Sequence, residues 1–176
     1  MRRVVGLSLV IYIPMLAGTF FVTSPGEFII RDWPRFAIAL GTCVATVPVL
    51  VTGSRWIARK TGWGRHLRDE FRLALGPLTS NDILWVSLLS GFGEEIVFRG
   101  VLLGRIGLAW STISFGLMHF PFRASLWPWT AFAAAVGLGL GAMTEWTGCL
   151  WPAILVHLCV NYFNLHDIVE TDQIIS

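Results

Sequence analysis

The chain has 176 residues, of which 55% are hydrophobic and only 14% are charged, and its mean hydropathy is +0.66. Soluble domains carry about 25% charged residues, so the composition excludes an ordinary water-soluble domain and favours a protein of the lipid bilayer. The formal net charge of +2 is small and the basic residues are scattered, which argues against a nucleic-acid partner.

Six apolar segments follow one another along the chain, at 4–23, 36–53, 83–106, 109–120, 129–146 and 148–165. A spanning helix needs about 20 residues, so 109–120 is short and is expected to be buried among its neighbours. The first segment is longer than the apolar part of a signal peptide, about 7–15 residues, and is interpreted as a retained helix. The sequence therefore predicts an all-α, polytopic transmembrane helical bundle of about six helices, forming one integral membrane domain over 1–176.

Residues 54–82 carry most of the charge and are predicted to form a partly amphipathic surface segment. Basic side chains gather there and before the first helix: Arg2, Arg3, Arg55, Arg59, Lys60, Arg65, Arg68 and Arg72. Because basic loops stay on the cytoplasmic side, we expect a cytoplasmic N-terminus, with residues 27–35 on the opposite side. Tryptophans near most of the predicted helix ends agree with this division into segments.

Local signals mark some helix ends and contacts. The stretch TSND at 79–82 offers N-caps for the third helix, and Pro121 closes the fourth. In the fifth, Ala131, Ala135 and Gly139 recur every four residues, which predicts a ridge that a neighbouring helix approaches closely.

Few strongly polar side chains lie inside the apolar segments: Glu94, Glu95, Arg99, His119, His157 and Asn161. Of these, Glu94, His119 and His157 lie roughly 14–17 Å from their predicted helix starts, near the middle of a core about 30 Å thick. A charge at the centre of a spanning helix costs about 2.5–3.5 kcal/mol, so these residues are interpreted as functional.

Helical geometry divides the acidic residues between two roles. Glu95 and Arg99 are four positions apart, with the acid first, and are expected to pair on one face as structural support. Glu94 points about 100° away from Glu95 and has no obvious partner on its own helix. A carboxylate in such surroundings is suited to act as a general base.

The histidines suggest what that base would do. His119 shares a helix face with Phe115, and His157 shares one with Asn161. A carboxylate and an imidazole can deprotonate a water, while a second imidazole and a carboxamide can stabilise an oxyanion. The chain has no HExxH and no GxSxG motif. A zinc ion bound by Glu94, His119 and His157 remains the alternative to a reaction that requires no cofactor.

Three short motifs carry a family resemblance: EEIVFR at 94–99, FGLMH at 115–119 and HLCVN at 157–161. Their order and separation resemble the CPBP intramembrane proteases, which include type II CAAX prenyl endopeptidases and bacterial Abi-type and bacteriocin-processing proteins. The resemblance covers about 80–165 as a catalytic core and implies a protease. In that core Glu94 and His119 would activate water, His157 and Asn161 would stabilise the oxyanion, and Glu95–Arg99 would support them.

The resemblance also implies a setting and a substrate. The chain is short for the family, which suits a compact prokaryotic member of the cytoplasmic membrane that cuts a membrane-embedded or lipid-associated protein or peptide. A C-terminal tail, a sorting signal, a CAAX-like sequence or a bacteriocin-type peptide would all fit. The alternatives are a non-catalytic Abi-like immunity or partner-binding protein and, more weakly, an ion pathway.

Overall fold

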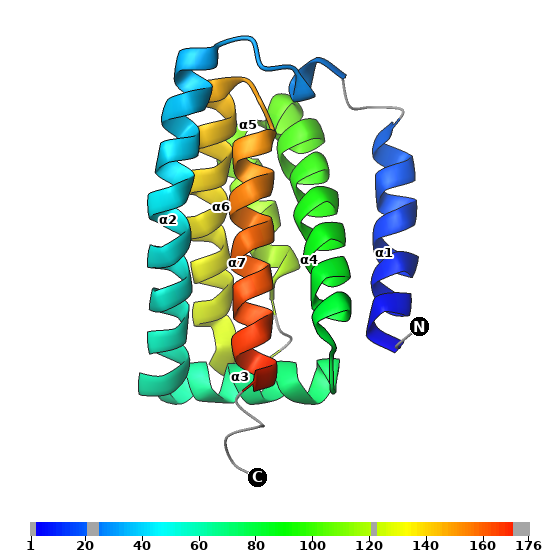
Figure 1. Ribbon diagram of the computed structural model, residues 1–176, viewed down its shortest axis with the longest axis vertical. Helices are drawn as coiled ribbons and strands as arrows, with labels where there is room; N and C mark the ends of the chain where they lie inside the picture. Colours follow the sequence, from blue (N-terminus) through cyan, green and yellow to red (C-terminus); the bar gives the residue numbers. More distant parts are fainter. Residues whose placement is uncertain (1–2, 21–24, 121–122, 171–176) are drawn as a thin grey trace.

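The computed structural model describes residues 3–20, 25–120 and 123–170, and all of its regular elements are helical (Figure 1). They are α1 (Arg3–Phe20), α2 (Trp33–Lys60), α3 (Gly62–Leu75), α4 (Ser80–Glu95), a π-helical segment (Ile96–Leu102), α5 (Leu103–Met118), α6 (Trp127–Thr147) and α7 (Trp151–Glu170), with 3-10 turns at Pro25–Phe28 and Ala124–Leu126. Six of the α-helices run along the long axis, while α3 lies across one end. The predicted all-α bundle is confirmed.

Two stretches are long and apolar enough to cross a membrane. One is α2, with 28 residues and a mean hydropathy of 2.0, and the other is Ser80–Met118, with 39 residues and a mean hydropathy of 1.4. A shorter apolar helix covers Ser8–Thr19. By length and composition, then, fewer described helices qualify as spans than the six apolar segments of the sequence suggested.

The 39-residue stretch is a helical hairpin rather than one rod. Gly107 has φ 76° and ψ 170°, a conformation outside the helical region that glycine adopts without the strain a Cβ would add. Contacts pair the residues on either side of this break: Ser111 Oγ donates to the Phe98 carbonyl at 2.7 Å, and the rings of Phe98 and Phe115 lie 5.1 Å apart. The reversal falls between the predicted segments 83–106 and 109–120, and it returns His119 to the level of Glu94.

Helix ends follow local chemistry. Thr79 is the N-cap of α4 and forms a capping box with Asp82, as the TSND stretch predicts. α5 ends at Met118 with His119 as its C-cap, and Pro121, predicted to close this helix, lies outside the described residues. Gly148, in the left-handed conformation, ends α6 before α7 begins.

The small-residue ridge predicted on α6 was placed on the wrong face. Ala131, Ala135 and Gly139 are exposed, and a Cβ at Gly139 would meet nothing within 4 Å. The packed positions are Ala133 and Gly137, where a Cβ on Gly137 would lie 2.8 Å from the Phe115 ring. The sequence alone could not distinguish these faces because small residues recur every four positions on both.

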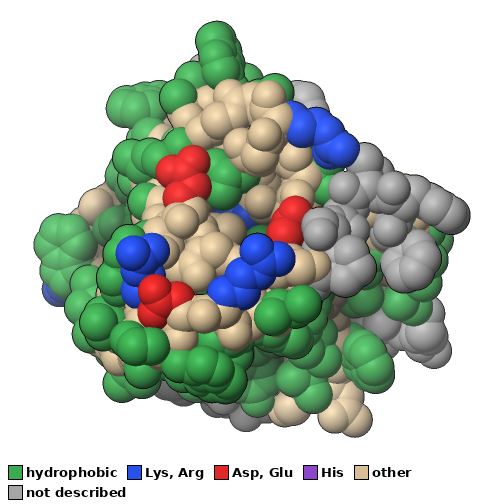
Figure 2. All heavy atoms as spheres, turned by 90° about the horizontal axis from the view of Figure 1, so that it is seen from above, with side chains coloured by type: hydrophobic (Ala, Val, Ile, Leu, Met, Phe, Trp, Pro, Cys, Tyr) green, Lys and Arg blue, Asp and Glu red, His purple; other side chains and the backbone are tan. Residues whose placement is uncertain are grey.

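The end of the bundle opposite α3 also carries charged side chains. Figure 2 looks onto this end and shows acidic and basic side chains near its centre, with apolar side chains around the rim. Asp32 caps α2 and pairs with Arg35, whose guanidinium also donates to the Trp146 carbonyl at 3.2 Å. Exposed apolar side chains such as Val44 and Val49 lie along α2. An apolar flank between charged ends is the distribution that a bilayer favours.

Candidate active site

Glu95 is the anchor of a buried polar cluster. Its side chain is fully buried, and Oε1 accepts from Arg99 Nη1 at 3.0 Å and contacts His157 Nδ1 at 2.6 Å. Arg99 also donates to the Gly137 carbonyl at 2.9 Å, and its guanidinium carbon lies 4.3 Å from the Phe115 ring centroid. The predicted Glu95–Arg99 pair is therefore present, and it additionally orients a histidine from α7.

Glu94 faces the two histidines from the neighbouring helices. Its Oε2 lies 3.5 Å from His119 Nε2 and 3.9 Å from His157 Nε2. This oxygen is buried and makes no hydrogen bond within the described part of the chain. Two imidazoles predicted from separate segments thus converge on one carboxylate oxygen.

The other oxygen of Glu94 binds a residue that the sequence analysis missed. Tyr12 on α1 donates its O–H to Glu94 Oε1 at 2.6 Å. Tyr12 lies outside the predicted catalytic core at 80–165, and the expectation that Glu94 has no obvious partner concerned only its own helix. A signal was available, because Tyr12 is one of only two tyrosines and its hydroxyl lies within an apolar segment.

Asn161 lies next to this cluster but is bonded elsewhere. Its Nδ2 donates to Ser90 Oγ at 2.9 Å, one helical turn before Glu94 on α4. His157 and Asn161 are four residues apart on α7, so they contact α4 at two positions about one helical turn apart. The second N–H of the Asn161 amide is not used by Ser90 and can serve a ligand.

Phe115, which shares a helix face with His119, closes one side of the site. It is buried, and its ring centroid lies 4.5 Å from that of His119 and 6.0 Å from that of His157. Trp129 of α6 packs on the far side of His119, with a centroid separation of 6.0 Å. Aromatic walls of this kind limit access of bulk water to the imidazoles.

The Nδ1 atoms of His119 and His157 fix the orientation of both imidazoles. His119 Nδ1 lies 2.8 Å from the Phe115 carbonyl, and His157 Nδ1 lies against the Glu95 carboxylate. Because a carbonyl or carboxylate oxygen accepts hydrogen bonds, each Nδ1 is assigned the hydrogen and donates it. The Nε2 atoms therefore face Glu94 and are the atoms available for chemistry.

The family model described as type II CAAX prenyl endopeptidase Rce1-like matches residues 77–163. These residues form an Rce1-like family domain. The chain is also 29% identical over 164 residues to "Uncharacterized protein YpbD" of Bacillus subtilis (strain 168), covering 87% of this chain and 81% of that protein. No solved structure gives a significant match.

The Rce1-like domain contains all six predicted site residues, whereas Tyr12 lies outside it. Membership in a family of CAAX prenyl endopeptidases implies a protease that acts on a protein or peptide. Together with the two long apolar helices, it indicates a membrane protein.

The side chains of Glu94, His119 and His157 are of the types that bind zinc. Catalytic zinc sites use histidine and glutamate ligands, and each ligating histidine usually donates its other N–H to a carbonyl or carboxylate. His119 and His157 are held in this way. No group of three or more His, Cys, Asp or Glu side chains among the described residues is already spaced to hold a metal ion. A metal here would require the three side chains to draw closer together.

Proposed function

We propose that the chain is an intramembrane endopeptidase that hydrolyses a peptide bond in a membrane-associated protein or peptide, using a water activated by Glu94 and His119. The observation that carries the proposal is the convergence of two imidazole Nε2 atoms, from α5 and α7, on Glu94 Oε2 at 3.5 and 3.9 Å. The Rce1-like domain supplies the reaction class.

In this mechanism a water donates hydrogen bonds to Glu94 Oε2 and His119 Nε2. Both are acceptors when Glu94 is ionised and His119 is neutral, so together they orient one oxygen lone pair toward the substrate carbonyl carbon. As the C–O bond forms, Glu94 takes the water proton. When the C–N bond breaks, the acid that has formed returns this proton to the leaving amine.

The developing oxyanion needs donors. His157 is suited to this role as an imidazolium, because its Nδ1 faces the buried Glu95 carboxylate and its Nε2 would then donate. The free N–H of Asn161 would supply a second donor. Arg99 balances the charge on Glu95 and keeps this carboxylate in place.

Zinc remains the alternative arrangement of the same residues. Glu94, His119 and His157 would hold the ion, which when bound would lower the pKa of a coordinated water. The support for this alternative is the anchoring of both Nδ1 atoms. A strong chelator separates the two arrangements, since activity that survives it excludes zinc.

The experiment uses the full chain in lipid nanodiscs with two internally quenched peptides, one bearing a farnesylated CAAX tail and one with the same sequence unprenylated. Cleavage of either peptide should fall about 10²–10⁴-fold in Glu94→Gln and His119→Ala, because each loses a proton-transfer partner. The exposed Glu145 on α6 provides the matched control Glu145→Gln, which should cleave normally.

Near-normal cleavage by the folded Glu94→Gln variant would contradict the proposed mechanism. Failure of the wild-type chain to cut either peptide, together with an unchanged cellular phenotype in Glu94→Gln, would favour the non-catalytic Abi-like alternative. Cleavage of only the farnesylated peptide would assign a prenyl substrate, whereas cleavage of both would assign a membrane-embedded peptide class.

The proposed setting is a prokaryotic cytoplasmic membrane crossed by the long helices, with the N-terminus and α3 on the cytoplasmic side. Support comes from the basic side chains at the end of α2 and along α3. Substrate would then reach Glu94 from within the bilayer.

A further inference from the structure

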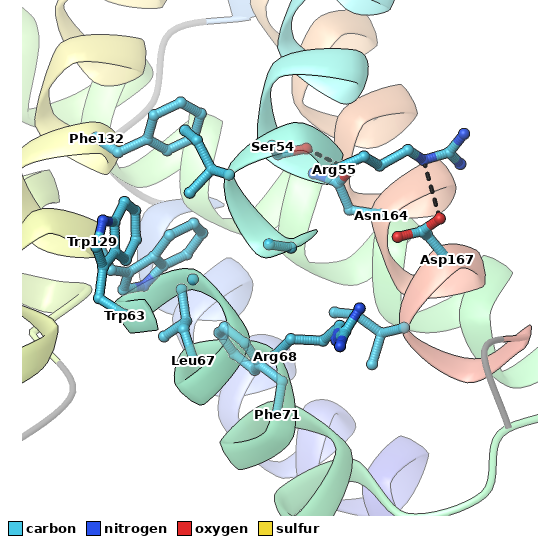
Figure 3. A pocket seen from close by; sticks show the side chains of 14 residues that line it. Ser54, Arg55, Trp63, Leu67, Arg68, Phe71, Trp129, Phe132, Asn164 and Asp167 are labelled. Atoms are coloured by element: carbon cyan, nitrogen blue, oxygen red, sulfur yellow. Dashed lines mark hydrogen bonds and ion pairs between the residues drawn. The ribbon is translucent and has the colours of Figure 1, made fainter. Parts of the chain in front are cut away.

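A pocket lies at the end of the bundle that α3 crosses, and Glu94 is not among the residues that line it (Figure 3). The pocket is an open groove with a cavity volume of about 100 Å³, lined by residues of α2, α3, α6 and α7. Its walls are mostly apolar and aromatic, including Ile57, Trp63, Leu67, Phe71, Trp129 and Phe132. The pocket therefore suits an apolar segment of a ligand that extends out through its open side.

The polar side chains in the pocket wall are largely engaged with one another. Ser54 Oγ donates to Asn164 Oδ1 at 2.8 Å, and Asp167 Oδ1 lies 3.3 Å from Arg55 Nε and 3.0 Å from Arg59 Nη2. A peptide entering here would bring backbone N–H and C=O groups that need partners of their own. An acyl chain brings none, so the wall favours a lipid over a peptide.

Arg68 supplies a cationic group along the pocket, where Figure 3 shows its side chain. The side chain is only 17% exposed, and its nearest acidic atom, Asp69 Oδ1, lies 4.0 Å from Nε. That Nε is buried and makes no hydrogen bond to any described residue. A guanidinium with an unused Nε donor beside an apolar cavity fits a phosphate attached to a hydrocarbon chain.

We propose that this pocket binds an anionic phospholipid, with an acyl chain between α3 and the bundle and the phosphate on Arg68. The surrounding charge agrees, because Arg59 and Lys60 end α2, and Arg65, Arg68 and Arg72 lie on α3. Clusters of basic residues next to membrane helices attract anionic lipids. Lipid binding here goes beyond peptide hydrolysis and does not depend on it.

The pocket also borders the candidate active site. Trp129 lines the pocket, packs edge-on against Phe71 of α3 and contacts the His119 ring. A bound acyl chain would therefore lie against the same tryptophan that walls His119. A peptide tail seated in the pocket is the competing occupant, and the experiment must separate the two.

The test is native mass spectrometry of the full chain released from detergent micelles containing phosphatidylglycerol and phosphatidylcholine in equal amounts. We expect one retained phosphatidylglycerol in preference to phosphatidylcholine. Arg68→Gln should weaken this binding about fivefold, the effect of one basic side chain near a lipid headgroup. Arg65→Gln is the matched control, since Arg65 is exposed, lies on the same helix and does not line the pocket.

Further variants keep the test decisive if Arg68→Gln does not fold. Arg68→Lys should retain part of the affinity, and Ala58→Phe, which fills the pocket without changing charge, should abolish retention. Equal retention of the two lipids, or equal weakening by Arg65→Gln, would overturn the proposal. So would displacement of the lipid by inorganic phosphate alone or by an unprenylated peptide with a free C-terminus.

Discussion

Tyr12 and Glu94 are 82 positions apart in the sequence, yet their side chains meet at 2.6 Å. The contact depends on Gly93, where a Cβ would lie 2.7 Å from the Tyr12 ring and 3.1 Å from Met15 Cε. α1 can therefore approach α4 closely at this turn. The tyrosine holds Oε1 and leaves Oε2 directed at the histidines, so in the proposed mechanism Tyr12 would position Glu94 without touching the substrate.

Replacing Tyr12 with phenylalanine tests this role. The phenyl ring keeps the packing over Gly93, but the hydrogen bond to a carboxylate, of a kind worth about 1.5–3 kcal/mol, is lost. We expect kcat for peptide cleavage to fall about tenfold while KM changes little, and the thermal midpoint to fall by several degrees because the hydrogen bond is lost. Steady-state kinetics of the full chain in nanodiscs measure the first two quantities, and thermal unfolding measures the third.

Tyr162→Phe is the matched control, because Tyr162 is the other tyrosine and packs against Phe163 and His166 on α7. It should leave kcat unchanged. An unaltered kcat in Tyr12→Phe would show that Glu94 needs no support from α1. A loss confined to thermal stability would reduce the contact to a packing role.

At the scale of elements, a helix break and a π-helical segment build the site. The reversal at Gly107 folds α5 back along α4, so that residues almost equally far from the break, Glu94 and His119, end at the same level. The π-helical turns after Glu95 carry Phe98 and Arg99 into the core between α5 and α6. Such turns occur often at functional sites.

A pair of glycines on α6 tests how tightly this core is packed. A Cβ at Gly137 would lie 2.8 Å from the Phe115 ring and 3.1 Å from Arg99 Nη2, so Gly137→Ala must displace the groups that support Glu95. We expect a loss of about 1–3 kcal/mol of stability, as for other overpacked cores. Thermal or denaturant unfolding of the solubilised chain measures the loss, with cleavage falling in parallel.

Gly139→Ala serves as the control, since nothing lies within 4 Å of a Cβ there. Alanine favours helix more than glycine does, so this variant should be as stable as the parent or slightly more so. If Gly137→Ala and Gly139→Ala had the same stability, the close packing of α5 against α6 at Gly137 would be contradicted.

The helices and the inward-facing acids could be predicted because they follow from local rules. Apolar length gave the segments, residue spacing separated Glu94 from Glu95, and a turn between 106 and 109 is where Gly107 reverses the chain. Contacts between distant helices could not be predicted in this way. Three such contacts are Tyr12–Glu94, His157–Glu95 and Asn161–Ser90. Each depends on which helices become neighbours, and residue spacing within one helix does not reveal that.

At the scale of the whole molecule, the two ends differ in shape and charge. α3 lies across one end, where Arg123 pairs with Glu70 and links it to the segment before α6. The opposite end carries the 3-10 turn Pro25–Phe28 and the junction of α6 and α7, tied together by the Leu150 N–H donating to the Glu27 carbonyl at 3.0 Å. If the long helices cross a bilayer, these ends face different compartments.

Cysteine labelling tests that arrangement directly. Alanine replaces the three native cysteines, and single cysteines are then placed as Arg31→Cys at the end opposite α3 and as Arg65→Cys on α3, both at exposed positions. The basic side chains favour α3 in the cytoplasm. A membrane-impermeant maleimide should therefore label the position 31 cysteine in intact cells and the position 65 cysteine only after permeabilisation. The opposite pattern would invert the orientation, and labelling of both in intact cells would contradict a spanning bundle, because no bilayer would then separate its two ends.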